Sequence, residues 1–590
     1  MLYNGYEVIE RMKINEVEKL TGLTKKAIRL YEDRGLITVS RSENGYRDYS
    51  YNDIGILKQI KLLRTAGVSL TDIKLLFTGM LSIDDLVEKR KKEIETESGL
   101  SSEQYTFCGK LAEHIANGDT VADEPFTENC DTGVREHGAL AVGMDIGTTT
   151  ISAAVVDIES KKQLEVFTIP HNSYTQSSSF SEQSVSAIMK KTEGLIALIF
   201  RSYSNIVSIG VTGQMHGIVY LNGDGEAVSD LINWQDKRAD IPLGDGLNTC
   251  ALIKKLTGES ISTGYGIATH YYNMLNGLVP ENAVGFCSIM DHFAMRLCNV
   301  KKPPIHTSVA ASFGFFDADK GCFKLDKLAL LGVDKAFLPS VTARNETVGS
   351  WNGIPVFVAI GDTQASVLGS VKNNRESLLI NIGTGSQVLA VGDSGSLGDD
   401  IECRPLINGE KLVCGAALCG GSAYALMESF FRSYAEAAGM GDISQYSTLN
   451  ALAKKAYESG EQPLSVNTAF CGKRSDSLCR GAIENIELNS FTPSALILGV
   501  ISGMCDELYG LYGALGIEKS HIVASGGAIR KNSVLRKVLE DRFCMTVSVC
   551  SVKEEAATGA ALYSAYALDL IEYKNGFPDF IKYVEREDIK

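Results

Sequence analysis

The chain has 590 residues, a net charge of −15 and 44% hydrophobic residues. At about 100–200 residues per domain, this length predicts three or more domains, and the composition is ordinary for a soluble globular protein. No apolar run approaches the roughly 18 residues of a membrane span, and the start MLYNGYEVIERMK lacks the basic and apolar regions of a signal peptide, so we expect a cytoplasmic protein without membrane contact.

The charge is unevenly distributed. Residues 12–77 contain 12 Lys and Arg against 8 Asp and Glu, a charge of +4, so the rest of the chain carries −19. A basic segment on an acidic body suggests contact with nucleic acid at one end only.

Residues 12–37 predict two short helices around a turn. In MKINEVEKLTGLTKKAIRLYEDRGLI, apolar residues recur at helical spacing on both sides of Thr21–Gly22–Leu23. Thr24 is a good N-cap for the second helix. Its cationic residues then point away from the apolar face, as in a recognition helix that enters a major groove.

The following residues predict a β-hairpin and two amphipathic helices. GLITVSRSENGYRDYS (35–50) carries the turn signal Asn44–Gly45, and YNDIGILKQIKLLRTAGVSLTDIKLLF (51–77) has the helical patterns. As a whole, residues 12–77 resemble the winged helix-turn-helix domain of the MerR family of transcriptional regulators. A small helical bundle with ordinary surface charge is the alternative. The resemblance implies contacts with double-stranded DNA from Lys25, Arg29, Tyr31, Arg41, Tyr46 and Arg47.

A helix and a linker follow this module. MerR proteins usually dimerise through a long helix at this place, and SIDDLVEKRKKEIETES (82–98) predicts a short one. Residues 99–138 have weak patterning and are interpreted as a linker. Whether the chain forms a homodimer is left open.

Residues 143–157, GMDIGTTTISAAVVD, predict two strands joined by a tight glycine turn. Residues 379–393, LINIGTGSQVLAVGD, repeat the pattern 236 residues later. Asp145, Gly147, Thr148 and Asp157 match Asn381, Gly383, Thr384 and Asp393 at this offset. Either copy alone would be an ordinary hairpin, but two copies at one offset indicate a duplicated domain.

Such a hairpin suits a polyphosphate. Glycine lets backbone N–H groups approach the phosphates, and threonine hydroxyls add donors. Asp145 is able to hold hydrated Mg²⁺, whereas the second copy has Asn381 and needs no second metal. The pair resembles the phosphate loops of the actin-like ATPase fold, in which two ribonuclease-H-like domains close over ATP. The implied ATP contacts are Gly147, Thr148, Thr149, Gly383, Thr384 and Gly385.

Two polar segments narrow the resemblance to the FGGY family of carbohydrate kinases, over roughly residues 140–570. VSIGVTGQMHGIVYLN (207–222) is similar to the sugar-contacting segment of xylulokinases and sedoheptulokinases, and INWQDKRAD (232–240) adds a second segment. A lone His or a polar loop is more often structural. The resemblance implies substrate contacts from Gln214, Met215, His216, Trp234, Asp236 and Arg238.

VFVAIGDTQASVLGS (356–370) presents Asp362 at the glycine turn that ends a strand. An isolated Gly-Asp is usually only a turn. Its position just ahead of the second hairpin, together with the family resemblance, implies that Asp362 is the general base that accepts a proton from the sugar's terminal hydroxyl.

Two Gly-Gly turns lead into predicted helices, in ALCGGSAYALMESFF (417–431) and in HIVASGGAIRKNSVLRKVLEDRF (521–543). A glycine pair lets the backbone approach a nucleotide at a helix N-terminus. The implied ATP contacts are Gly420, Gly421, Gly526, Gly527 and Asn532. The chain departs from the family at Val309, where a polar residue is common, and at Ser525, where a third glycine is common.

These observations predict an α/β kinase of two ribonuclease-H-like domains, preceded by a winged helix-turn-helix domain. The expected segments are the DNA-binding domain at 12–77, a helix and linker at 78–138, the sugar and metal domain at 139–372 and the nucleotide domain at 373–570. The expected reaction is phosphorylation of a ketose at its terminal hydroxyl by ATP and Mg²⁺, with sedoheptulose as first choice and D-xylulose next, linked to transcriptional regulation. One alternative is a sugar-sensing regulator that uses a weakly active or inactive kinase body as its ligand receptor. Another is a kinase whose N-terminal domain has lost DNA binding.

Overall fold

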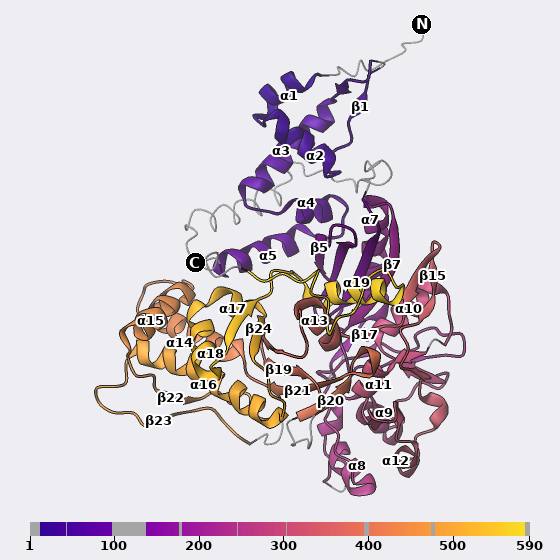
Figure 1. Cartoon of the computed structure of the whole chain (residues 1–590), viewed down its shortest axis with the longest axis vertical. Coiled ribbons are helices and arrows are strands. Elements are labelled where there is room, and N and C mark those ends of the chain that lie inside the picture. The colour runs from indigo at the N-terminus through magenta and orange to yellow at the C-terminus, as the bar shows by residue number, and fades with distance from the viewer. Residues whose placement is uncertain are drawn as a thin grey trace. The chain divides into compact units, whose positions relative to one another are not determined.

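The computed structural model describes residues 12–42, 44–96, 137–175, 180–244, 246–302, 304–393, 401–473 and 478–584 (Figure 1). The chain divides into two compact units, one of residues 1–137 with 193–205, the other of residues 138–192 with 206–590. The predicted linker at 99–138 lies almost entirely outside the described residues.

The first unit has the helices and the hairpin that were predicted. Helices α1 (Ile14–Thr21) and α2 (Lys25–Asp33) are separated by Gly22 in the left-handed conformation, and the Thr24 hydroxyl caps α2 by accepting the N–H of Ala27. Strands β1 (Ser40–Arg41) and β2 (Arg47–Asp48) pair around the Asn44–Gly45 turn. The remaining helices are α3 (Tyr51–Thr65), α4 (Leu70–Phe77) and α5 (Ile83–Thr96).

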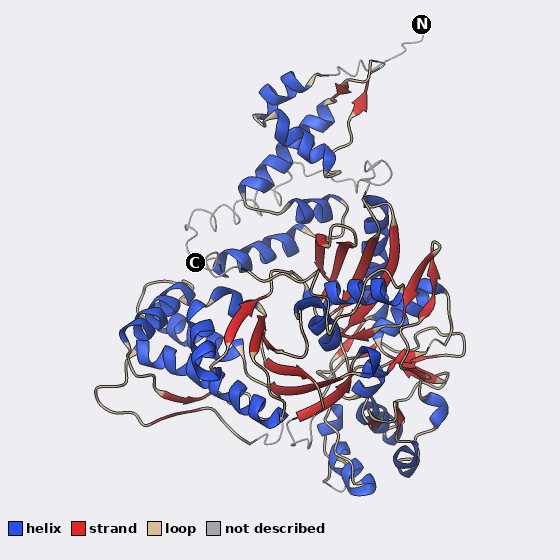
Figure 2. Cartoon of the chain, viewed as in Figure 1, coloured by secondary structure: helices blue, strands red, loops and turns tan. Residues whose placement is uncertain are grey.

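The second unit is built on two sheets of related topology, drawn as red arrows in Figure 2. The first runs in the order β15-β16-β7-β3-β4-β5, with β17 beside β7, and the second in the order β20-β21-β19-β18-β24-β25. In each, an antiparallel hairpin (β3–β4 or β18–β19) has a parallel neighbour (β7 or β24). This repetition confirms the predicted α/β fold of two similar halves. The strands of the first sheet are β3 (Leu140–Ile146), β4 (Thr150–Asp157), β5 (Lys162–Pro170), β7 (Ile206–Gly213), β15 (Thr347–Trp351), β16 (Ile354–Phe357) and β17 (Ile360–Gly361); those of the second are β18 (Ser377–Ile382), β19 (Ser386–Val391), β20 (Ile401–Pro405), β21 (Lys411–Ala417), β24 (His521–Ser525) and β25 (Thr546–Val549).

The two hairpins differ by one residue in their turns. Ile146 pairs with Ile151 in the first hairpin, and Ile382 pairs with Ser386 in the second. The offset of 236 residues therefore holds for the first strands but falls to 386 − 151 = 235 for the second strands. The expected match of Asp157 with Asp393 is wrong. Because the second turn is one residue shorter, Gly392 is the residue of the second hairpin that is equivalent to Asp157.

Two helices pack so closely that only glycine fits between them. Helix α13 (Asp362–Ser370) begins at the end of β17, and α19 (Glu555–Ala567) returns from the second half to cover the first sheet. A Cβ on Gly559 of α19 would lie 1.8 Å from the carbonyl oxygen of Ala365 in α13, and one on Gly143 of β3 would lie 1.8 Å from that of Ala557. The C-terminal helix is thus a structural part of the first half.

The second half contains one long apolar helix, α16 (Pro493–Leu515), which meets the length and composition of a membrane span. Most of its apolar stretch is buried, in the core that it shares with the second sheet and with α14 (Gly421–Ala437), α15 (Tyr446–Ser459) and α18 (Ser533–Phe543). We therefore interpret α16 as a core helix.

Candidate active site and candidate DNA-binding surface

Asp145 is the penultimate residue of β3 and lies just before the first glycine turn, residues 147–149. Its Oδ1 atom is buried and has no hydrogen-bond partner in the described part of the chain. Burial raises the pKa of this carboxyl well above its usual value, and the nearby carboxylates of Asp362 and Glu554 raise it further. A divalent cation would satisfy Oδ1 and offset the repulsion that Asp362 and Glu554 exert on Asp145, so this position fits a metal.

The carbonyl oxygens of the first glycine turn are all bound from the protein side. His171 shares a 3.2 Å hydrogen bond between its Nε2 atom and the oxygen of Gly147, and its backbone N–H donates to that of Thr149. Two amide side chains complete the set, Gln214 donating to Gly147 at 3.2 Å and Gln183 to Thr148 at 2.7 Å. Because the protein binds all three carbonyl oxygens, this arrangement fits a turn whose N–H groups bind an anion.

His171 and Gln183 were not found from the sequence. Both are buried, at 2% and 0% exposure. His171 directly follows β5, and Gln183 belongs to the short strand β6 (Glu182–Gln183), so neither lies in a glycine motif. Burial lowers the pKa of His171, so the ring is neutral near pH 7 and its second nitrogen, Nδ1, lies 2.7 Å from the Ser173 hydroxyl. A neutral ring fits the donor role of Nε2 toward Gly147.

Asp362 is the first residue of α13 and is partly exposed. Its Oδ1 atom accepts the N–H of Thr363 at 2.6 Å and the Thr363 hydroxyl at 3.1 Å. Burial raises the pKa of Asp362, against the opposing effects of the Arg404 cation and the Thr363 hydrogen bonds. A carboxylate of raised pKa that keeps one oxygen available is suited to accept a proton.

Arg404 connects the two halves of the second unit. It lies on β20, forms an ion pair with Glu402 at 2.5 Å and donates to the Thr363 hydroxyl at 3.2 Å. Glu402 also accepts the hydroxyl of Tyr265, at 2.6 Å, and the Tyr265 ring lies 4.2 Å from the ring of His216. No sequence signal pointed to Arg404, because it is distant in sequence from both the acid and the sugar segment.

The 207–222 segment places its three predicted site residues differently. Met215 is buried and lies close to Gly361, while Gln214 bonds the first turn and Gln183. His216 has a left-handed backbone (φ +73°) that the hydrogen bonds of its N–H and ring to Ser312 hold in place. The segment therefore gathers beside Asp362 and the first turn at once.

The 232–240 segment divides into an exposed and a buried part. Trp234 is 46% exposed, and its indole N–H donates to the Thr148 hydroxyl at 2.9 Å. Asp236 and Arg238 are 1% and 3% exposed and form an ion pair at 2.8 Å. Arg238 also binds Asn273 and Glu182, at 2.8 and 2.6 Å. Asp236 and Arg238 thus support one another in the core, whereas Trp234 is exposed beside the first turn.

The second glycine turn, residues 383–385, is held by the N-terminus of α14. The N–H groups of Gly420 and Gly421 donate to the carbonyl oxygens of Thr384 and Gly383, at 2.9 and 2.8 Å, and Ser422 donates to Thr384 as well. These two glycines support the turn through their amides.

The third glycine turn leads into α17 (Gly527–Lys531). Gly526 has φ +97°, and a Cβ there would lie 2.4 Å from the oxygen of Ile382, so the close approach requires glycine. Asn532 is 8% exposed and caps α18 by accepting the N–H groups of Val534 and Leu535, at 3.0 Å each.

The candidate DNA-binding residues of the first unit are mostly on its surface. Lys25 and Arg29 lie on α2, where Arg29 is exposed, and Tyr46 at the hairpin is 73% exposed. Arg41 and Arg47 both pair with Glu32 of α2, Arg41 at 3.3 Å, which ties the hairpin to the helix.

One expected DNA contact is wrong. Tyr31 is only 7% exposed, because it falls on the inner face of α2 with Ile28. It is a core residue of this domain and lies on the opposite side of α2 from the exposed Arg29.

Three segments of the chain match known families. Residues 140–369 match the N-terminal domain of the FGGY family of carbohydrate kinases, and residues 378–568 match its C-terminal domain. The chain belongs to the FGGY family. Residues 12–79 match the helix-turn-helix domain of MerR family regulatory proteins. The chain is therefore a sugar kinase with a MerR-type DNA-binding domain, as predicted.

Individual relatives cover each part of the chain. Sedoheptulokinase from Mus musculus is 25% identical over 470 residues, which are 72% of this chain and 96% of the relative. The HTH-type transcriptional regulator CueR from Escherichia coli O157:H7 is 36% identical over 135 residues, 22% of this chain and 99% of the regulator. The solved xylulose kinase from Lactobacillus acidophilus has a TM-score of 0.66 at 18% identity and covers 76% of this chain and 93% of its own. This last likeness shows the FGGY fold.

Proposed function

We propose that the chain transfers the terminal phosphate of ATP to the terminal hydroxyl of a ketose, with sedoheptulose as first choice and D-xylulose next. FGGY kinases use ATP with a divalent metal, and the uncompensated carboxylate of Asp145 supports Mg²⁺ at this position, where it would neutralise charge on the phosphates. The names of the sedoheptulokinase and xylulose kinase relatives support the substrate class.

In this proposal Asp362 acts as the general base. Its Oδ1 atom is held by Thr363, so Oδ2 is the oxygen that accepts the proton of the sugar hydroxyl. The N–H groups of the first turn bind phosphate oxygens, and Trp234 fixes the Thr148 hydroxyl of the same turn. The observation that carries the proposal is the placement of Asp145 and Asp362 close enough to raise the pKa of Asp145.

We propose that His216 and Trp234 contact the substrate directly. Gln214 and Met215 would act through the residues that they contact, Gly147 and Gly361. His216 stacks on Tyr265, which belongs to the Glu402–Arg404 network beside Asp362. Trp234 is exposed and bonded to the first turn. A sugar lying between them would contact both the phosphate turn and the base. The nucleotide would occupy the second and third turns, at residues 383–385, 420–421 and 526–527.

We further propose that the N-terminal domain binds double-stranded DNA as a homodimer and couples a regulatory response to the sugar. The outer face of α2 and the exposed Tyr46 support the DNA contact, since paired helix-turn-helix domains read two half-sites. Such a chain works where ATP and DNA are both available, in the cytoplasm. The alternative, a sensor with an inactive kinase body, is less favoured because a sensor has no need of both Asp145 and Asp362.

An ADP-release assay across a panel of ketoses tests the kinase proposal. Wild type should turn over sedoheptulose or D-xylulose far faster than it hydrolyses ATP alone, and Asp362→Asn should abolish the difference. Turnover of no ketose by wild type would favour the sensor. DNA-shift assays with the wild type and Arg29→Ala, each with and without the best ketose, test the regulatory proposal, and sugar-independent binding would contradict the coupling.

A further inference from the structure

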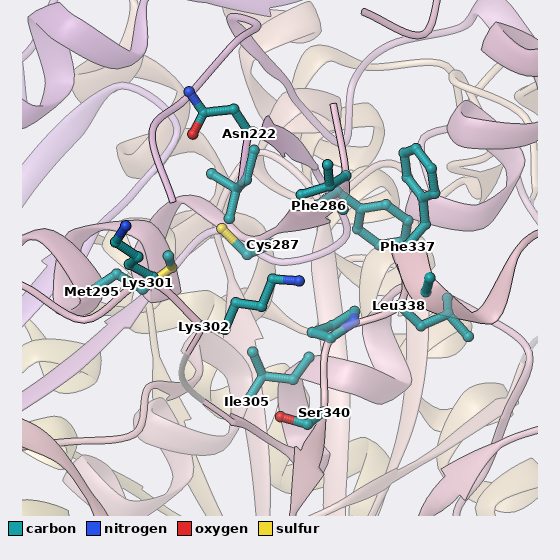
Figure 3. Close-up of a pocket in the computed structure, with 15 residues that line it drawn as sticks. Asn222, Phe286, Cys287, Met295, Lys301, Lys302, Ile305, Phe337, Leu338 and Ser340 are labelled. Carbon is teal, nitrogen blue, oxygen red and sulfur yellow. The ribbon is translucent and has the colours of Figure 1, made fainter. Parts of the chain in front are cut away.

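A cavity lies in the first half of the kinase, apart from the proposed catalytic residues. It has a volume of about 230 Å³ and is lined by the short strands β8 (Val219–Leu221) and β10 (Gly285–Cys287), by residues 336–340 and by parts of residues 295–305 (Figure 3). Leu221 and Asn222 of the lining belong to the end of the 207–222 segment, but none of the lining residues is in a glycine turn, in the Asp362 site or among the proposed sugar contacts. A ligand here would therefore be distinct from ATP and sugar.

The walls of this cavity are apolar. Phe286, Cys287, Met295 and Ile305 are each at most 3% exposed, and Phe337 and Leu338 close the side opposite Met295 in Figure 3. In an apolar pocket of this kind, each methylene group or ring that the ligand buries makes the free energy of binding more favourable. The pocket thus favours a ligand with a hydrocarbon body.

Two neighbouring lysines at the cavity differ in orientation and in pairing. Lys301 points away from the centre in Figure 3, and its Nζ atom pairs with Asp224 at 2.6 Å. Lys302 extends toward the centre of the ring of apolar side chains. Among the residues that the structure describes, no carboxylate forms an ion pair with Lys302. Lys302 is an exposed residue, so its ammonium group stays hydrated and is available to pair with an anion whose apolar part lies against the cavity walls.

We propose that this cavity binds a small amphiphilic carboxylate, with the hydrocarbon chain against Phe286, Met295 and Ile305 and the carboxylate on Lys302. Asn222 and Ser340 also line the cavity and offer polar groups beside the charge. Charge complementarity selects an anion over a cation, and the apolar walls select a hydrocarbon chain over acetate or inorganic phosphate. The site is a binding site only, and it requires neither ATP nor the kinase reaction.

Isothermal titration of the full-length chain with octanoate, below its micelle concentration and without ATP or sugar, tests the proposal. Octanoate should bind saturably and raise the melting temperature, while acetate should do neither. Lys302→Gln should weaken octanoate about fivefold, the usual scale of a partly exposed ion pair, and should leave the affinity for 1-octanol unchanged. Lys301→Gln is the matched control, because it removes the same charge from the lysine that faces Asp224.

Three outcomes would overturn the proposal: no saturable binding of octanoate, equal effects of Lys302→Gln and Lys301→Gln, or an equal loss of 1-octanol binding in Lys302→Gln. A competition titration with ATP separates the two sites. Binding of octanoate that ATP abolishes would place the ligand in the kinase site and would also contradict the proposal. Because no measurement depends on turnover, failure here leaves the proposed kinase function untouched.

Discussion

Replacement of Asp362 by Asn isolates the proposed proton transfer from the architecture of the site. The amide oxygen of Asn can keep the hydrogen bonds that Thr363 donates to Oδ1, at 2.6 and 3.1 Å, so only the proton-accepting oxygen is exchanged for a donor. A general base is worth about 10²–10⁴ in rate, which corresponds to about 2.7–5.5 kcal/mol of barrier. We expect kcat for the best ketose to fall by this factor and the KM for ATP to change little.

The same variant should be more stable than the wild type. Burial raises the pKa of Asp362 above its ordinary value of 3.8, so the folded protein holds the charged form at a cost. Well below pH 3.8 both states carry the protonated acid and the advantage of Asn is absent. The advantage grows as the pH rises from 3.8 to the raised pKa of the folded state, and it is constant above that pKa. Thermal melts from pH 4 to 8 measure this difference, and the acidic limb of kcat/KM should lie above pH 3.8 for the same reason.

Asp319→Asn is the matched control, because it removes an exposed surface carboxylate that forms an ion pair with Lys411. It should leave both kcat and the pH dependence of stability unchanged. If Asp362→Asn retained more than a tenth of the wild-type kcat, the assignment of the base would be wrong. If its melting temperature fell at neutral pH, the carboxylate would instead be stabilised by Arg404, and the reasoning from burial would be refuted.

Three further predictions follow from hydrogen bonds and charges of the described residues. His171→Phe removes one of the two side-chain donors to the Gly147 oxygen. At about 1 kcal/mol per hydrogen bond, the KM for ATP should rise about fivefold while kcat stays nearly constant. A fivefold fall in kcat at constant KM would argue against a role of His171 in positioning the turn. Arg238→Met leaves the buried carboxylate of Asp236 without its cation, so urea denaturation should show a loss of about 3–5 kcal/mol, and a loss below 1 kcal/mol would contradict the buried pair. Arg29→Ala should lower the salt dependence of DNA binding by about one unit in the slope of log K against log salt; an unchanged slope would remove Arg29 from the phosphate contacts.

The local signals of the sequence predicted most of the elements around the site. Local sequence predicted three features of the first unit, because each depends on the backbone preferences of a few adjacent residues: the Thr24 cap, the Gly22 turn and the Asn44–Gly45 hairpin. The two glycine hairpins were readable for the same reason, and their repetition indicated the duplicated fold. The exact pairing after the turn was not, since one residue more or fewer in a turn changes the register without changing the pattern of strand residues.

Whether a single residue of a polar segment is buried or exposed was harder to predict. Tyr31 lies in a basic helix that faces solvent on one side, and it was assigned to the wrong face. Asp236 and Arg238 belong to a polar segment, but they are buried because each neutralises the other and Asn273 and Glu182 take the remaining donors of Arg238. Polarity alone does not distinguish a ligand contact from a satisfied buried pair.

The sequence by itself determined the family, the two glycine turns and two acids, Asp145 before the first turn and Asp362 after β17. Only the tertiary structure decided which side chains hold those groups: His171, Gln183 and Gln214 under the first turn, and Arg404 beside Asp362. The physical reason is that a turn is specified by the conformational limits of glycine and its neighbours, whereas a hydrogen bond between Arg404 and Thr363 exists only because strands from two halves of the chain end at the same place.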